Sequence, residues 1–193
     1  MSNFIDDIFM PQFYKQTWKR GRNETFKNLM KYLEDNNIKN PIIVETGTTR
    51  LAHKQAGDGH ATRIFDAYIN YYDGQVYSID IDKKACECAK SLVSKKSNII
   101  CSDSVKYLNE FNKKIDLLYL DSFDFNSRNP EPSMKHHLKE LLASLKNLKP
   151  GSLVVVDDNK VSDKGKGYYV KEHLLKLNAK ILFDEYQLGF IFP

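Results

Sequence analysis

The chain has 193 residues, a hydrophobic content of 41% and a formal net charge of +4 at pH 7. This length is typical of one domain with a buried core, and no uncharged run approaches the roughly 18 apolar residues of a membrane-spanning helix. The N-terminus lacks a secretory signal, and the lysines are scattered rather than clustered. These features exclude a membrane protein, disfavour a nucleic-acid partner and predict a cytoplasmic location.

Residues 1–40 precede the first expected strand and are predicted to be helical. Asn23 is interpreted as the N-cap of a helix that continues to about Asn36, with apolar residues at helical spacing. The aromatic segment 4–18 before this helix is interpreted as a lid or a homodimer contact.

Apolar runs of strand length alternate with stretches of helical period from Pro41 onward. Such alternation is typical of a parallel sheet whose strands are connected by helices. Asp73-Gly74 and Pro150-Gly151 predict breaks before the second and fifth runs. The runs are residues 42–46, 76–81, 99–101, 115–120 and 153–156, and the helical stretches between them are 61–72, 85–93 and 134–145.

A further helix is expected over residues 169–177, and two β-prone segments follow at 180–185 and 188–192. Only a couple of residues separate these two segments, so they can pair only as an antiparallel hairpin. The predicted sheet therefore has a parallel part and an antiparallel C-terminal end.

Glycines and polar residues follow the first expected strand, at the sheet edge where open α/β sheets bind their ligands. Glycine lets backbone approach a ligand closely, and a helix N-terminus directs free N–H groups toward it. A lone Gly-x-Gly is as often a plain turn as a ligand site. The candidates for ligand binding here are Glu45, Gly47, Gly57, Asp58, Gly59 and His60.

The second expected strand adds an acid at its end, Asp80, which lies about 20 residues after Gly59. That spacing suits a carboxylate that accepts hydrogen bonds from ribose hydroxyls. Asp82 is the competing candidate, and its alternative role is to cap the helix that starts at Lys83. We favour Asp80 as the ribose-binding residue.

The third expected strand ends in the triplet Ser102-Asp103-Ser104. Asp103 has two candidate roles, as a cap of the next helix and as a partner of an adenine amino group. Taken alone, capping is the better interpretation, and the two roles are compatible.

These elements and strand-end residues resemble class I methyltransferases, which bind S-adenosylmethionine. The resemblance covers residues 42–159 and rests on Glu-x-Gly, the strand-end acid, Ser-Asp-Ser and a Leu-Asp pair that ends in Asp121. It implies that Glu45 and Gly47 lie by the methionine part of the cofactor, Asp80 at the ribose and residues 102–104 around the adenine. We expect Asp121 to bind the cofactor as well.

The same resemblance implies an α/β fold, a Rossmann-like three-layer sandwich with a mostly parallel seven-stranded sheet and a C-terminal antiparallel hairpin. We expect one methyltransferase domain over residues 1–193, in which 1–40 form an N-terminal helical segment and 41–193 the Rossmann-like core. One departure from the family is the loop 48–56, which lengthens the connection after the first strand.

Acids also follow the fourth and fifth expected strands, at Asp121 and at Asp157-Asp158-Asn159. This arrangement resembles the metal-dependent O-methyltransferases of the catechol type. The resemblance implies that Asp121, Asp158 and Asn159 hold a divalent cation. Oxygen ligands of this kind suit Mg²⁺, Mn²⁺ or Ca²⁺, although Asp and Asn also commonly cap strand ends and turns.

Catechol-type enzymes place a lysine three residues after the first ligand acid, where this chain has Asp124. A catechol acceptor is therefore disfavoured, and Asp121 and Asp124 are the candidate catalytic residues. Asp124 has the alternative roles of base, metal ligand and ordinary loop acid. The predicted function is transfer of a methyl group to a hydroxyl oxygen of a small molecule, such as a sugar or a secondary-metabolite-like compound, with help from a divalent cation.

Two other classes of function share these features. A nucleotide-dependent oxidoreductase would use the Gly-x-Gly turn and Asp80, but Thr62 stands at the third glycine position and no hydride-transfer pair is evident. A non-catalytic binding protein could use the same fold, because fold does not settle function. The residues after the fourth strand do not match the Asn-Pro-Pro-Tyr type of motif that holds a flipped base in nucleic-acid methyltransferases.

Overall fold

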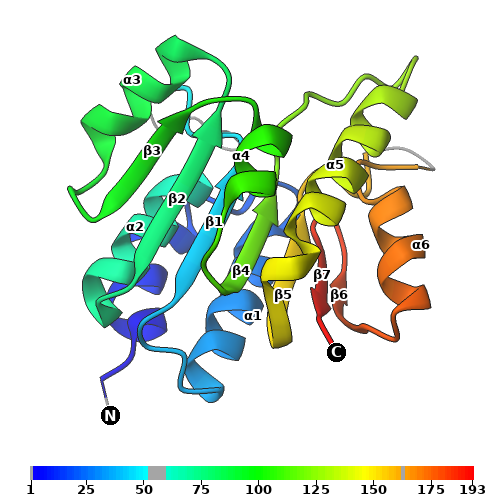
Figure 1. Cartoon of the computed structure of the whole chain (residues 1–193). Coiled ribbons are helices and arrows are strands. Elements are labelled where there is room, and N and C mark those ends of the chain that lie inside the picture. Colours follow the sequence, from blue (N-terminus) through cyan, green and yellow to red (C-terminus); the bar gives the residue numbers. More distant parts are fainter. Residues whose placement is uncertain (1, 52–59, 162–163) are drawn as a thin grey trace.

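The computed structural model describes residues 2–51, 60–161 and 164–193, which form a twisted sheet covered by helices (Figure 1). The strand order in this sheet is β3-β2-β1-β4-β5-β7-β6. The first five strands pair in parallel, and β7 is antiparallel to both β5 and β6. The strands are β1 (Ile42–Thr46), β2 (Gln75–Asp80), β3 (Ser97–Cys101), β4 (Ile115–Leu120), β5 (Leu148–Val156), β6 (Lys180–Asp184) and β7 (Leu188–Ile191).

The predicted mostly parallel sheet with an antiparallel C-terminal end is confirmed, and the bounds of β1 and β4 agree with the prediction. Strand β5 differs, because it begins at Leu148 rather than after Pro150-Gly151. Gly151 has a positive φ of 85°, and the pairing register with β4 shifts between Ile115 and Leu117. The two breaking residues therefore form an irregularity inside the strand rather than its start.

Helices cover both faces of the sheet, and alternate strand residues divide between two cores. One core joins Ile43 and Leu117 to the N-terminal helices and α2, and the other joins Val44 and Leu118 to α5 and α6. No helix in the described ranges is long and apolar enough to cross a membrane. The helices are η1 (Ile5–Tyr14), η2 (Lys19–Gly21), α1 (Arg22–Asp35), α2 (His60–Tyr72), α3 (Lys83–Leu92), α4 (Ser104–Glu110), α5 (Glu131–Ser144), η3 (Leu145–Asn147) and α6 (Tyr168–Lys176).

The aromatic N-terminal segment contributes to the core. Helix η1 is a π-helix, and Phe4, Phe9 and Phe13 are buried against the sheet together with residues of α1 and α2. Burial of these side chains explains the aromatic composition that suggested a lid, so these three phenylalanines are core residues. The homodimer contact stays a prediction.

Helix α1 begins earlier than the sequence suggested, and the assignment of Asn23 as its N-cap is wrong. The N-cap is Gly21, and Asn23 lies inside the first turn. Arg20 and Gly21 both have positive φ values, of 61° and 75°, so the chain reverses there without a capping side chain. The helix consequently starts at Arg22.

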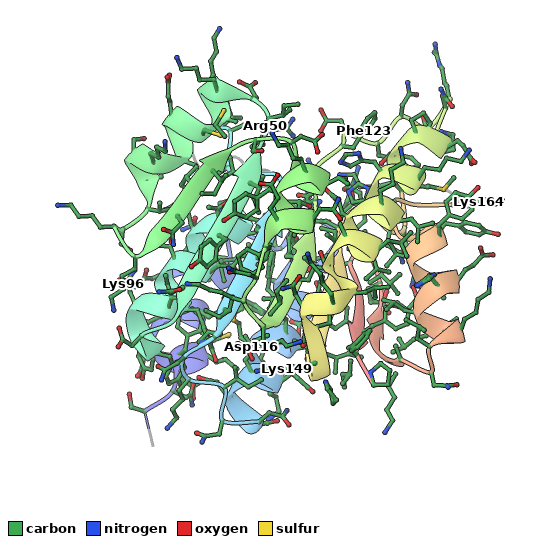
Figure 2. All side chains as sticks on the ribbon, viewed as in Figure 1. Arg50, Lys96, Asp116, Phe123, Lys149 and Lys164 are labelled. Carbon is green, nitrogen blue, oxygen red and sulfur yellow. The ribbon has the colours of Figure 1, made fainter. Side chains whose placement is uncertain are left out.

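The two ends of the parallel strands differ in chemistry. At the amino ends, Asp116 accepts a hydrogen bond from the Ile42 N–H at 2.8 Å and pairs with Lys149 at 2.6 Å. Figure 2 shows this pair at the opposite end of the sheet from Arg50 and Phe123, which lie near the carboxyl ends. Strand β1 lies between β2 and β4, so the chain reverses its direction of winding there and opens a crevice at the carboxyl ends.

Candidate functional site

A cavity of about 730 Å³ lies at this crevice. Its walls come from the carboxyl ends of β1, β2, β4 and β5, from the N-terminal segment and from the loop before α6. The size falls in the range of small-molecule and cofactor sites. The predicted site residues that line it are Glu45, Gly47, His60, Asp80, Asp103, Ser104, Asp121, Asp124 and Asp158.

Gly47 holds the ends of β1 and β4 close together. Its φ is 81°, and its N–H donates to the Ile79 carbonyl oxygen at 2.7 Å. A Cβ atom at this position would lie 2.4 Å from the Asp121 carbonyl oxygen. Only glycine combines this backbone conformation with this close approach to Asp121. The predicted close approach of a first-loop glycine to a ligand stays a prediction.

Glu45 is buried, and the Ser78 hydroxyl donates to its carboxyl oxygen at 2.5 Å. Burial raises the pKa of Glu45 to about 8, against the opposing effect of the Ser78 hydrogen bond. Burial thus favours the neutral form of the Glu45 carboxyl, and in that form it can donate as well as accept a hydrogen bond.

Asp80 and Asp82 have different roles in the structure. The Asp80 carboxylate accepts the N–H of Thr48 at 3.1 Å and the N–H of Asp82 at 2.8 Å, which fixes its orientation at the edge of the cavity. Each carboxylate oxygen has a second lone pair for a ligand hydroxyl. Asp82 is the N-cap of α3 and accepts the N–H groups of Lys84 and Ala85.

The three residues of the Ser-Asp-Ser triplet have different positions: Asp103 and Ser104 line the cavity, and Ser102 does not. Asp103 caps α4 by accepting the Lys106 N–H, and it also lines the cavity. The hydroxyl of Ser104 lies on the cavity wall and donates to Glu140 at 2.5 Å. Ser102 is not among the lining residues, and its hydroxyl donates to the Asp103 carbonyl oxygen. Its predicted position near an adenine stays a prediction.

Helix α5 adds two residues that the sequence did not reveal. His136 lines the cavity, and its Nε2 lies 3.2 Å from the carboxylate of the fully buried Glu140. The hydrogen bond with Glu140 raises the pKa of His136. Their spacing of four residues on one helix face was the available signal.

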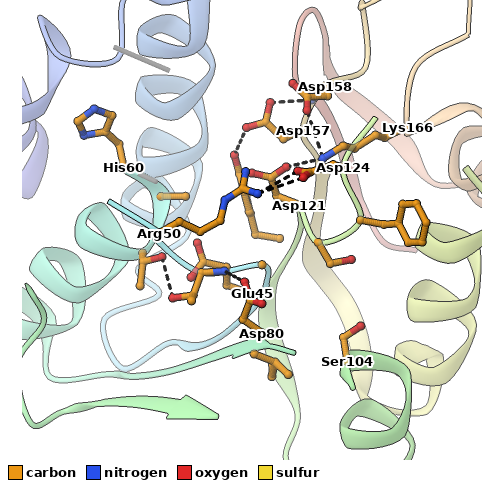
Figure 3. Close-up of a pocket in the computed structure, with 18 of the residues that line it drawn as sticks. Glu45, Arg50, His60, Asp80, Ser104, Asp121, Asp124, Asp157, Asp158 and Lys166 are labelled. Atoms are coloured by element: carbon orange, nitrogen blue, oxygen red, sulfur yellow. Dashed lines mark hydrogen bonds and ion pairs between the residues drawn. The ribbon is translucent and has the colours of Figure 1, made fainter. Parts of the chain in front are cut away.

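The predicted cofactor residues Gly57, Asp58 and Gly59 lie outside the described residues, as does most of the lengthened loop. His60 is the first residue of α2, and its buried side chain lines the cavity. Figure 3 shows it on the far side of the cavity from Asp121 and Asp158.

Lys166 lies among the acids Asp121, Asp157 and Asp158 that follow β4 and β5, and the sequence analysis did not identify it. Only 1% of this residue is exposed. Its ammonium lies 2.8 Å from Asp121 Oδ1 and 3.2 Å from Asp158 Oδ2, as Figure 3 shows. Burial lowers the pKa of Lys166, but the two carboxylates outweigh burial and raise the pKa above its ordinary value.

Arg22, at the start of α1, supplies a second cation to the same acids. Its Nη2 lies 2.9 Å from Asp157 and 3.1 Å from Asp158, and its guanidinium stacks over the Tyr186 ring. The buried Asp157 also accepts the Tyr119 hydroxyl at 2.7 Å. Asp157 and Asp158 both reach the Arg22 guanidinium. Strand alternation ends at Val156, and Asp158 has a φ of 51°.

Asn159 is directed away from the other two predicted metal ligands. Its amide nitrogen donates to Asp184 at 3.0 Å and to the Glu185 carbonyl oxygen at 3.1 Å, and it does not line the cavity. The position of Asn159 as a partner of β6 disagrees with its predicted ligand role. Its backbone contributes instead to the fold of the loop that carries Lys166.

Asp124 lies at the mouth of the cavity. Its side chain is 76% exposed and pairs with Arg50 at 3.1 Å, across the gap between the loops after β1 and β4 (Figure 3). An exposed ion pair of this kind contributes little to stability.

The described residues do not fit a divalent cation at the predicted position. Mg²⁺ requires several oxygen ligands in close to octahedral geometry. The carboxylates of Asp121 and Asp158 face the ammonium of Lys166, and Asn159 points elsewhere. Within the described ranges, no group of three or more His, Cys, Asp or Glu side chains could hold a metal ion.

Methyltransferases are among the solved structures with a similar fold. The MycE methyltransferase of the mycinamycin biosynthetic pathway, in complex with Mg and SAH, matches with a TM-score of 0.61 and 16% identity over 83% of this chain and 47% of its own. The O-methyltransferase NovP matches with a TM-score of 0.59 and 14% identity over 84% of this chain and 75% of its own. A putative rRNA-methylase from Clostridium thermocellum has a TM-score of 0.52 and 16% identity over 82% and 94% of the two chains.

The chain thus shares its fold with solved methyltransferases, one of which is described as an O-methyltransferase. It spans about half the length of MycE. At identities this low, the comparison shows the fold and does not identify a substrate. No model of a protein family matches the sequence, and no curated protein matches it.

Proposed function

We propose that this protein transfers the methyl group of S-adenosylmethionine to a hydroxyl oxygen of a small molecule. The observation that carries the proposal is the position of Asp80 beside Gly47 at the switch-point cavity. A carboxylate there suits the two ribose hydroxyls of a nucleoside cofactor. The neighbouring structures with bound SAH support the same cofactor.

The chemistry requires mainly alignment. A methyl group on a sulfonium is already activated, so the site has to place the acceptor oxygen in line and exclude water. Of the two acids predicted to be catalytic, Asp121 is better placed, because Lys166 holds its carboxylate on the cavity wall. We assign Asp121 to orient the acceptor hydroxyl. Asp124 is exposed and paired with Arg50, so we assign it no chemical step.

We expect S-adenosylmethionine and its demethylated product to bind the purified protein, and nicotinamide and flavin nucleotides not to bind. Isothermal titration calorimetry measures all of these directly. Equal or tighter binding of a nicotinamide dinucleotide would favour the oxidoreductase alternative. Binding of the methyl donor without turnover of any hydroxylated acceptor would favour a non-catalytic binding protein.

The sequence hypothesis of a divalent cation makes a separate prediction about turnover. A cation-assisted reaction stops in chelator and restarts with added Mg²⁺ or Mn²⁺. The position of Lys166 between the acids favours the opposite result, and we expect full turnover in EDTA once an acceptor is found. Abolition by EDTA with recovery in Mg²⁺ would restore the original metal hypothesis.

A further inference from the structure

The acids that resemble a metal site already contact an internal cation. Lys166 is almost fully buried, and its ammonium makes close contacts with Asp121 and Asp158, one from each of two adjacent strand ends. A buried lysine is rarely found unless its charge is paired. The residue lines the same cavity as Asp80 and Gly47.

The loop before α6 is folded to put Lys166 there. The Lys166 N–H donates to the Asp158 carbonyl oxygen at 3.1 Å, so the lysine backbone is anchored to one of the acids that its side chain contacts. A Cβ on Gly165 would lie 1.7 Å from the Asn159 carbonyl oxygen, and one on Gly167 would lie 2.8 Å from Leu188. Glycines on both sides therefore allow the loop to pack tightly with the lysine directed inward.

The repulsion among clustered acids, which predicted a metal ion, can also be reduced by positively charged side chains. Asp121, Asp157 and Asp158 gather near two strand ends and repel one another. Lys166 and Arg22 together supply two positive charges to these acids, which is the charge of one divalent ion. Two cations against three carboxylates leave one net negative charge, so side chains alone offset most of the repulsion.

We propose that the ammonium of Lys166 takes the place of a divalent cation at the methyl-transfer site. It holds Asp121 and Asp158 in position and keeps Mg²⁺ and Mn²⁺ from binding between them. An ammonium has three donors. With Asp121 and Asp158 as its partners among the described residues, one remains to donate to an acceptor oxygen. The last step rests on the proposed function, whereas the exclusion of metal does not.

The test measures Mn²⁺ binding by electron paramagnetic resonance, which requires neither an acceptor nor a turnover assay. The proteins are the wild type, Lys166→Ala, the double variant Lys166→Ala with Asp158→Ala, and Lys160→Ala as a control. Lys160 is on the same loop, but its side chain is 52% exposed and pairs with Glu185. We expect Lys166→Ala to bind Mn²⁺ at least tenfold more tightly than the wild type and the control, and the double variant to lose this gain.

Two results would overturn the proposal. One is stoichiometric Mn²⁺ binding by the wild type that a further single variant, Asp158→Ala, abolishes. The other is a folded Lys166→Ala protein that gains no affinity. Circular dichroism checks folding, and Lys166→Gln provides a neutral side chain of similar length if the alanine variant does not fold. Titration of SAH into the same samples tests the proposed function separately, because its failure would leave the Mn²⁺ result interpretable.

Discussion

Replacement of Lys166 with methionine is expected to lower the free energy of unfolding by about 3 kcal/mol. Removal of one partner from a buried ion pair typically costs about 3 to 5 kcal/mol, because the other charge stays buried without compensation. Here Arg22 still pairs with Asp158, and the Asp121 side chain is 35% exposed, so we expect the lower end of this range.

Urea denaturation followed by circular dichroism measures this loss, with Lys160→Met as the matched control. Lys160 is exposed and pairs with Glu185 at the surface, so its replacement should change stability by less than about 1 kcal/mol. Equal effects of the two substitutions would contradict the assignment of Lys166 as a structural cation of the site.

Replacement of Asp80 with alanine is expected to weaken binding of S-adenosylmethionine and SAH by about tenfold to a hundredfold. The range follows from a total loss of about 1.5 to 3 kcal/mol when the charged hydrogen-bond partner of the ribose is removed. The Asp80 carboxylate also anchors the Thr48 N–H, so the substitution removes support from the loop after Gly47 as well. Calorimetric titration of SAH measures the change.

Asp82→Ala and Asp80→Asn are the controls for this result. Asp82 lines the same cavity, but its carboxylate accepts the N–H groups of Lys84 and Ala85 as the cap of α3, so its loss should cost about 1 kcal/mol of stability and weaken cofactor binding much less than Asp80→Ala. Asp80→Asn keeps the shape and one acceptor oxygen, and we expect a smaller loss of affinity than for alanine. A binding defect in Asp82→Ala with a tolerant Asp80 would show that the wrong acid had been assigned to the ribose.

Much of the fold could be predicted because parallel strands buried on both faces are continuous apolar runs. All six residues of β4 are buried, and its predicted bounds agree with the structure. The hairpin of β6 and β7 followed from a connection too short for any other pairing. The misplaced start of β5 has a local cause, since Pro150 and Gly151 usually end strands and here lie within an irregular one.

The candidate site could be predicted only in part. Strand ends of a parallel sheet meet at one edge, so the positions of Glu45, Asp80 and Asp121 around one cavity followed from the order of elements. The roles of individual acids did not follow, because Asp is equally suited to cap a helix and to bind a ligand. Asp82 and Asp103 illustrate this, as both cap helices while lining the cavity.

The sequence by itself determined which elements form and which acids stand at the strand ends, because apolar periodicity is local along the chain. The tertiary structure alone decided what neutralises those acids. Arg22 is far from Asp158 in the sequence, and Lys166 stands on the loop that follows Asp158, at a spacing that no motif identifies. Whether three acids at a sheet edge hold a metal or a lysine depends on how the loop before α6 folds. In the described part of that loop, a Cβ on Gly165 would clash with Asn159 and one on Gly167 with Leu188, so the position of Lys166 depends on packing that the sequence pattern does not show.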